Sequence, residues 1–135
     1  MEYKGSCLCG NIEFKVVGEI KRFYLCHCDY CRKDTGSAHA ANLFFDCGEL
    51  YWKKGELDVV KFNHQGTRHS KSFCSRCGSG MPIKEGNVVI VPAGSLDRNI
   101  DRRPDAHIFM GSKGNWDHDL EYLETYKTFP VQDNG

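Results

Sequence analysis

The residues of this 135-residue chain whose type and spacing can do chemistry are its eight cysteines. Four of them form two pairs, each followed by glycine: Cys7-Leu-Cys9-Gly10 and Cys74-Ser-Arg-Cys77-Gly78. Structural zinc sites use four ligands, with sulfur at ~2.3 Å, and two close cysteine pairs supply them well. A glycine after the second cysteine allows a positive φ, with which backbone N–H groups turn toward the sulfurs. The two pairs predict one closed zinc site whose binding energy is also folding energy.

Two other interpretations of these four cysteines stay open. A redox C-x-x-C needs a helix that starts at its first cysteine, whereas Gly78-Ser-Gly-Met-Pro82 follows Cys77 and disfavours a helix there. Disulfides need an oxidising compartment. The polar N-terminus, Met-Glu-Tyr-Lys-Gly-Ser, lacks the apolar segment of a signal peptide. We therefore expect a cytoplasmic protein whose thiols bind metal.

A second group of three thiols lies within six positions, in Cys26-His27-Cys28-Asp-Tyr-Cys31. No fourth cysteine lies nearby once the first site has taken its four. Three protein ligands and one open position are typical of a reactive zinc. An open zinc can bind an external thiol and hold it as a thiolate nucleophile. We therefore predict two zinc ions per chain, with Cys26, Cys28 and Cys31 forming the catalytic site.

Several neighbours of this second group admit two interpretations. His27 lies between two ligands, so its side chain should point away from the metal, although it is an alternative fourth ligand. Cys47 is another alternative ligand, but a buried core cysteine is the preferred interpretation. Arg32 and Lys33 could offset the thiolate charge or hold a carboxylate of the incoming molecule, and the alternative is that they are solvated surface cations. The remaining histidines show no ligand spacing and are assigned to surface or core roles: His39, His64, His69, His107 and His118.

The elements that must position these thiols are mainly short β-strands. Ile12, Phe14 and Val16 alternate with charged residues, which is the period of a half-buried strand. Other strands are expected at 43–45, 57–62, 67–73 and 106–110, with a buried central strand at 88–91 paired to residues 81–84 through a turn at Gly86. Short helical turns are expected at 28–33 and 119–123.

Composition limits the class of partner. Lys plus Arg and Asp plus Glu are both 18, so the formal net charge is zero, and electrostatic binding to nucleic acid or to a membrane surface is not expected. Three arginines within residues 97–105 are interspersed with three aspartates, which indicates a solvated surface of mixed charge: Arg98, Arg102 and Arg103 with Asp97, Asp101 and Asp105. No apolar run approaches the ~20 residues of a membrane span. We expect one domain over residues 1–131 and a frayed tail over 132–135.

Four motifs in this order resemble the glutathione-dependent formaldehyde-activating enzyme family, also described as the centromere-protein-V-like domain. They are Gly5-Ser-Cys7-Leu-Cys9-Gly10, Cys26-His-Cys28-x-x-Cys31-Arg-Lys-x-x-Gly36, Phe73-Cys74-x-x-Cys77-Gly78 and Ala93-Gly-Ser-Leu-Asp97. The resemblance extends to His107-Ile-Phe109 and Trp116, and seven cysteines in register make it specific.

The resemblance implies a zinc-bound β-tent fold of short antiparallel sheets. It also implies a structural zinc on Cys7, Cys9, Cys74 and Cys77, and a second zinc on Cys26, Cys28 and Cys31 at which the glutathione thiol binds. The implied activity is addition of glutathione to formaldehyde, giving S-hydroxymethylglutathione, formally a carbon–sulfur lyase reaction in reverse. The alternative is a non-catalytic protein-interaction module of the same fold, because fold similarity alone does not fix function.

Overall fold

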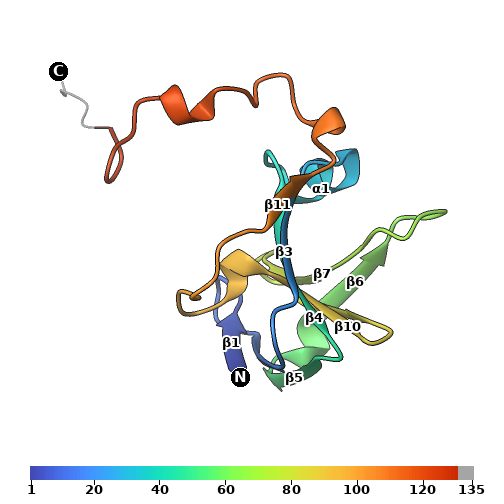
Figure 1. Cartoon of the computed structure of the whole chain (residues 1–135). Helices are drawn as coiled ribbons and strands as arrows, with labels where there is room; N and C mark the ends of the chain where they lie inside the picture. The colour runs from blue at the N-terminus through green and yellow to red at the C-terminus, as the bar shows by residue number, and fades with distance from the viewer. Residues whose placement is uncertain (131–135) are drawn as a thin grey trace.

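The computed structural model describes residues 1–130, and the predicted tail over 132–135 lies outside them (Figure 1). The strands are β1 (Glu2–Ser6), β2 (Glu13–Val17), β3 (Arg22–Cys26), β4 (Ala40–Asp46), β5 (Glu49–Lys54), β6 (Val59–Asn63), β7 (Ser70–Cys74), β8 (Gly80–Met81), β9 (Ile83–Glu85), β10 (Val88–Pro92) and β11 (Ala106–Ile108). The α-helix is α1 (Asp29–Thr35), and short 3-10 turns are η1 (Glu56–Asp58), η2 (Ala93–Ser95), η3 (Met110–Ser112) and η4 (Leu120–Tyr122).

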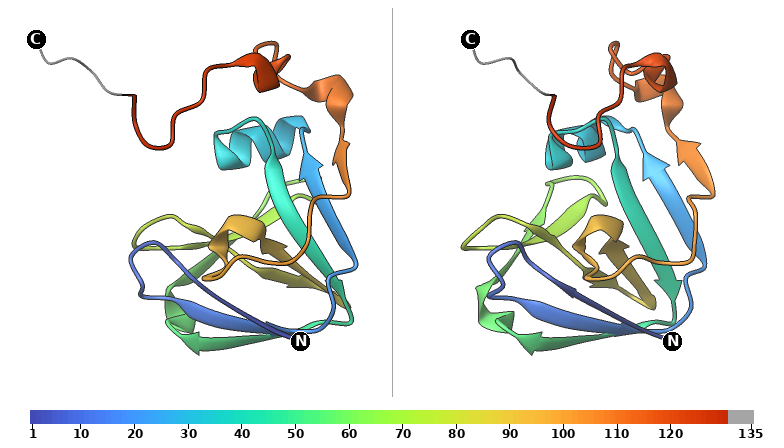
Figure 2. Two further views of the ribbon diagram at one scale, coloured as in Figure 1. Left: turned by 60° about the vertical axis from the view of Figure 1, so that its left-hand side comes forward. Right: turned by 90° about the vertical axis from the view of Figure 1, so that its left-hand side faces the viewer.

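The strands form three sheets with the orders β1-β2-β5, β11-β3-β4-β10-β9 and β6-β7-β8. Neighbouring strands are antiparallel except β11, which runs parallel to β3. Figure 2 shows the sheets inclined toward one another, with the segment after β11 passing α1 and running away from them. The predicted mainly β fold of short antiparallel sheets with few helical turns is confirmed.

One apolar core holds the first sheet against the β4–β10 pair. The predicted alternation in β2 is confirmed, since Ile12, Phe14 and Val16 are all buried. They pack in one cluster with buried residues of the neighbouring sheet: Phe23, Leu43, Phe45, Val89 and Val91. Aromatic rings also lie close within the first sheet and across the core, with Tyr3 to Phe45 at 5.3 Å and Phe14 to Trp52 at 6.2 Å between ring centroids.

The predicted central strand is confirmed as β10, which lies between β4 and β9. Val89 and Val91 are fully buried, because β10 is covered by paired strands on both sides and by the core on one face. Gly86 has φ of 58° in the turn between β9 and β10, as the predicted hairpin requires. The predicted partner segment 81–84 is divided, since β9 pairs with β10 whereas Met81 belongs to β8 and pairs with β7. The helical turns predicted at 28–33 and 119–123 correspond to α1 and η4.

Several strand boundaries differ from the prediction. Residues 56–58 form η1, so β6 begins only at Val59. β7 begins at Ser70, because the loop before it is a turn in which the His64 N–H donates to the His69 carbonyl oxygen at 2.9 Å. The late strand ends at Ile108. Strands β1, β3 and β5 were not predicted, since β1 and β5 are largely exposed and show little apolar alternation.

No helix among residues 1–130 is long and apolar enough to cross a membrane. The fold places the cysteines at the ends of strands. Cys26 ends β3 directly before α1, Cys74 ends β7, and the turn after β1 contains Cys7 and Cys9.

The backbone at Gly5 in β1 is packed closely against the Phe14 side chain and leaves no room for a Cβ atom. A Cβ atom there would overlap the Phe14 ring and lie 2.5 Å from the backbone oxygen of Ser95. Because backbone cannot move aside cheaply, we expect Gly5→Ala to lower the free energy of unfolding by about 1–3 kcal/mol. Chemical denaturation at constant metal content would measure the change. Gly111→Ala is the matched control, since a Cβ there meets no atom within 4 Å, and equal losses in both variants would contradict the packing argument.

Candidate metal centres and the cleft that joins them

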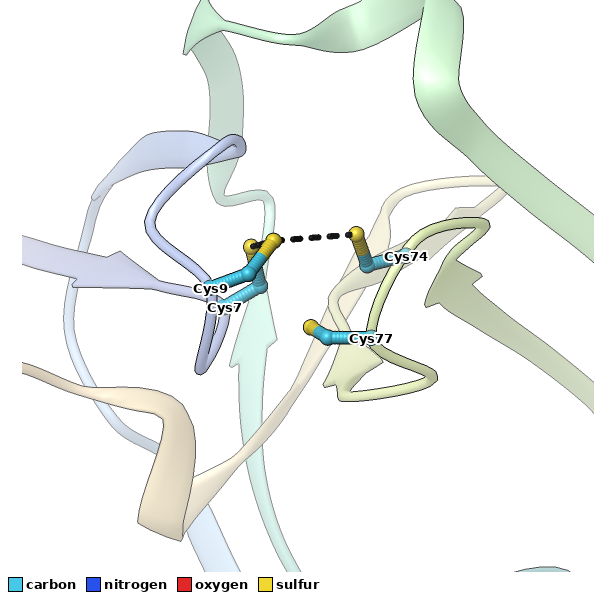
Figure 3. Close-up of side chains that lie close together, drawn as sticks. All are labelled: Cys7, Cys9, Cys74 and Cys77. Carbon is cyan, nitrogen blue, oxygen red and sulfur yellow. Dashed lines mark hydrogen bonds between the residues drawn. The ribbon is translucent and has the colours of Figure 1, made fainter.

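The first cysteine cluster joins the turn after β1 to the turn after β7 (Figure 3). Its sulfurs belong to Cys7, Cys9, Cys74 and Cys77, and all four lie within 4.8 Å of one another. Cys9 and Cys74 are 65 positions apart in the chain, yet their Sγ atoms are 3.9 Å apart. The four sulfurs predicted to form one site are therefore together.

The spacing of these sulfurs fits a tetrahedral metal ion. Four sulfurs at ~2.3 Å from one ion would be about 3.8 Å apart at the corners of a tetrahedron. The Sγ atoms of Cys7 and Cys9 are 3.6 Å apart, and those of Cys9 and Cys74 are 3.9 Å apart. Because a disulfide needs ~2.05 Å between sulfurs, this arrangement favours metal binding, and all eight cysteines are free thiols.

Backbone N–H groups support the sulfurs, as the glycines predict. Gly10 and Gly78 have φ of 78° and 76°. The N–H of Ile12 donates to Cys7 Sγ at 3.2 Å, and the N–H of Arg76 donates to Cys74 Sγ at 3.3 Å. Such bonds stabilise thiolates, which are the form that binds metal.

Ser79 links the two turns of this cluster. Its hydroxyl accepts a hydrogen bond from the Leu8 N–H at 2.9 Å and lies 3.2 Å from Cys77 Sγ. The Ser79 hydroxyl, followed by backbone N–H groups of Cys9 and Ser79, lowers the pKa of the Cys77 thiol to about 5. Ser79 is a supporting residue that the cysteine spacing did not identify.

The second cluster is built around the start of α1. Cys26 ends β3, Cys28 is the N-cap residue, and Cys31 lies in the first turn of the helix. The N–H of Cys31 donates to Cys28 Sγ at 3.3 Å, so a sulfur fills the capping role usually taken by a side-chain oxygen. The three sulfurs lie within 4.8 Å of one another, and no fourth His, Cys, Asp or Glu atom of residues 1–130 joins them.

Burial makes this second cluster unfavourable for thiolates alone. Cys26 and Cys31 are buried, and burial raises the pKa of both thiols above the ordinary value, most strongly for Cys31. For Cys28 burial also acts to raise the pKa, but hydrogen bonding from the Cys31 N–H and the neighbouring thiols outweighs burial and lowers it. A bound cation would offset the cost of three adjacent thiolates, so the donor set and its surroundings could hold a metal ion.

His27 is turned away from the second cluster, as its position between two ligands predicts. Its side chain is buried, and its Nε2 lies 2.9 Å from Nδ1 of His107. Its Nδ1 lies 3.0 Å from Oδ2 of Asp117. Burial lowers the pKa of His27, and Asp117 offsets only part of this. The C-terminal segment is thus held against the back of the second cluster, a contact that no sequence spacing indicated.

The preferred interpretation of Cys47 was wrong. Cys47 is exposed and lies outside both clusters. It occupies the turn between β4 and β5 with φ of 58°, and its side chain leaves the core because the turn reverses the chain there.

Two arginines form ion pairs at the surface. Arg32 pairs with Asp29 at 2.9 Å on α1. Arg102 pairs with Asp105 at 2.8 Å, which agrees with the mixed surface predicted for this region.

A cleft of about 700 Å³ reaches both clusters and is lined by Cys7 of the first and Cys31 of the second. Apolar residues of the sheets form much of its wall: Ala41, Met81, Ile83, Ile90, Pro92 and Leu96. Asp34, His69 and Lys71 supply polar groups to its lining. The volume lies within the range of small-molecule sites. The sequence did not predict His69 here, because it approaches α1 only through the folding of the β6–β7 hairpin.

Comparisons with known proteins agree on one family. The model of the family described as "Glutathione-dependent formaldehyde-activating enzyme" matches residues 2–112. A curated protein of Halomonas elongata, named "Putative glutathione-dependent formaldehyde-activating enzyme", is 30% identical over 128 residues, covering 86% of this chain and 80% of that protein. The crystal structure of a Rhodobacter sphaeroides protein matches with a TM-score of 0.55 and 23% identity, over 77% of this chain and 98% of that one. This structural likeness concerns the fold alone.

The free cysteine outside both clusters allows a matched test of the first one. We expect Cys74→Ser to bind one metal ion fewer per chain than the parent and to unfold about 10 °C or more lower, because metal binding there is coupled to folding. Cys47→Ser should match the parent in both respects. Elemental analysis of desalted protein and thermal unfolding measure the two effects. Unchanged metal content in Cys74→Ser would contradict the site.

Proposed function

Because this chain belongs to the glutathione-dependent formaldehyde-activating enzyme family, we propose that it adds a small thiol such as glutathione to formaldehyde or another small aldehyde. The product is a hemithioacetal, S-hydroxymethylglutathione for that pair, and its cleavage is a carbon–sulfur lyase reaction. One observation carries the proposal: three cysteine sulfurs lie together without a fourth ligand among residues 1–130, and one of them, that of Cys31, belongs to a residue that lines a cleft of about 700 Å³.

The two clusters take different roles in this proposal. Cys7, Cys9, Cys74 and Cys77 hold a closed structural zinc, since four sulfurs complete its coordination. Cys26, Cys28 and Cys31 hold a second zinc with one position free for a soft ligand. When bound there, zinc supplies the charge that keeps an incoming sulfur ionised at neutral pH.

The residues of the chain then supply position and surroundings. α1 fixes Cys28 and Cys31 one turn apart, so the thiol enters beside the helix start. The apolar wall of the cleft removes water from the aldehyde and holds it near the sulfur. Thiols add to aldehydes without a catalyst. In this proposal the protein accelerates the addition by holding the two reactants close together and by assisting the proton transfer.

A second candidate function is a protein-interaction module. The segment after β11 carries many large apolar side chains that are more than half exposed: Phe109, Trp116, Tyr122, Leu123, Tyr126 and Phe129. Exposed apolar groups in such number are typical of contact surfaces. This function needs no thiol at the second cluster, so thiol binding separates the two candidates.

Cobalt substituted for zinc gives a direct measure of thiol binding. We expect reduced glutathione to increase the sulfur-to-cobalt charge-transfer absorption of the protein, because a fourth sulfur joins three. Cys28→Ala should lose this increase and remain folded, whereas Cys47→Ser should keep it. Oxidised glutathione, which has no free thiol, is the ligand control. An unchanged spectrum with reduced glutathione would favour the interaction module.

Catalysis is measured separately by NMR exchange between formaldehyde and the hemithioacetal. We expect the zinc-loaded protein to accelerate formation of S-hydroxymethylglutathione above the rate in buffer. The chelator-treated protein and Cys28→Ala should both return to the rate in buffer. Equal rates for the parent and Cys28→Ala would contradict a reaction at the second cluster.

A further inference from the structure

Three polar side chains that are mostly buried line the cleft that Cys31 of the second cluster also lines. Oδ2 of Asp34 is 2.7 Å from Nε2 of His69, and its Oδ1 is 2.8 Å from Nζ of Lys71. The three side chains are only 19%, 19% and 28% exposed. All three residues line the same cleft as Cys31, so they share the space in which the proposed thiol and aldehyde meet.

The fold brings this group to the second cluster from two elements. Asp34 follows Cys31 by three positions on α1, a spacing at which helical side chains are neighbours. His69 is the last residue of the turn between β6 and β7, and Lys71 is the second residue of β7, so both lie at the turn end of this hairpin. The ion pair of Lys71 with Asp34, and a bond from Lys71 Nζ to the Asp34 backbone oxygen at 3.2 Å, hold the hairpin to the helix.

The His69 ring is fixed in one orientation. Its backbone N–H donates to Thr67 Oγ1 at 3.0 Å, and the Tyr30 ring lies 5.7 Å from it between centroids. Asp34 binds one ring nitrogen, Nε2. Within residues 1–130 no group hydrogen-bonds the other nitrogen, Nδ1, which is therefore free for a substrate atom. A carboxylate bonded to one nitrogen of a histidine fixes the orientation of the ring and thereby the position of the other nitrogen.

The charged groups around His69 come from α1 and from β7. Asp34 is the anion that faces it from α1, and Lys71 on β7 shares that carboxylate and balances much of its charge. His64 on the hairpin contacts Tyr30 rather than Asp34, with ring centroids 5.3 Å apart. Asp34 thus orients the His69 ring while its second oxygen is engaged by Lys71.

We propose that His69 is the catalytic acid–base residue of the thiol addition, an inference that rests on the proposed function. Addition of a thiol to an aldehyde forms one carbon–sulfur bond from a sulfur electron pair and breaks the C=O π bond, whose electrons pass to oxygen. One proton must move from sulfur to that oxygen. His69 Nδ1 accepts it from the entering thiol and returns it to the oxygen of the adduct, so no other reactant is needed. Asp34 is the positioning residue.

Proton counting on thiol binding tests this role without using the reaction. Calorimetry of reduced glutathione binding to the zinc-loaded protein, in buffers of different ionisation enthalpy, measures the protons released per thiol. We expect the parent to release close to zero protons at pH 7, because His69 keeps the proton. His69→Gln, which retains a donor toward Asp34, should release about one. His64→Gln, on the same hairpin but outside the cleft, should behave as the parent.

The rate of hemithioacetal formation is the second measurement. We expect His69→Gln to slow the catalysed rate roughly 100-fold, which is typical for loss of an acid–base group, with the cobalt response to glutathione unchanged. Added imidazole should restore part of the rate to His69→Ala, an effect that a structural role would not produce.

The possible results separate the two proposals. If the parent does not accelerate the addition at all, the proposed function fails and the role of His69 fails with it. If the parent accelerates it and His69→Gln matches the parent in rate and proton count, only the role of His69 is overturned. Loss of the cobalt response in His69→Gln would show a structural role and would also overturn it.

Discussion

The gathering of seven thiols into two tight clusters is the constraint on which this fold depends. Sulfurs held within 4.8 Å of one another cannot all ionise without a nearby positive charge, and most of those in the second cluster are buried. A cation held in each cluster would remove this repulsion, and in the first cluster it would also cross-link two distant parts of the chain. The first cluster joins the turn after β1 to the turn after β7, at the margin of a core that is small because the strands are short. Metal binding there would add to the cohesion that larger domains obtain from apolar burial.

β7 connects the two centres physically. Cys74 at its end belongs to the first cluster, while Lys71 near its start bonds Asp34 on the helix that carries Cys31. A five-residue strand, paired on both sides, thus fixes the distance between the first cluster and the polar residues of the cleft. Rigid elements of this kind hold functional groups more accurately than loops do. The position of the cleft wall follows from the same strand that the first cluster secures.

Much of this arrangement follows from the sequence. Metal ligands have characteristic short spacings, and the glycine after each cysteine pair allows the positive φ that the turn requires. Cys9-Gly10 and Cys77-Gly78 predicted both the partners and the turns. The alternation in β2 and the apolar run of β10 predicted buried faces, because the period of apolar residues along a strand shows which face is covered. The contacts of His69 and His27 were not predictable, since each depends on residues 35 and 90 positions away that only the tertiary structure brings near. Cys47 was misassigned because composition favours burial of cysteine while turn geometry directs this one outward.

The two clusters differ in how much chain must be made before each is complete. Cys26, Cys28 and Cys31 span six residues, so this cluster can form within one short segment before β4 and β11, the sheet partners of β3, have been made. Cys7 and Cys9 must wait for Cys74 and Cys77, and closing that longer loop costs about 2 kcal/mol more in chain entropy. The spacing therefore favours early completion of the second cluster, which is local in the chain, and later completion of the first cluster, whose two halves are distant in the chain.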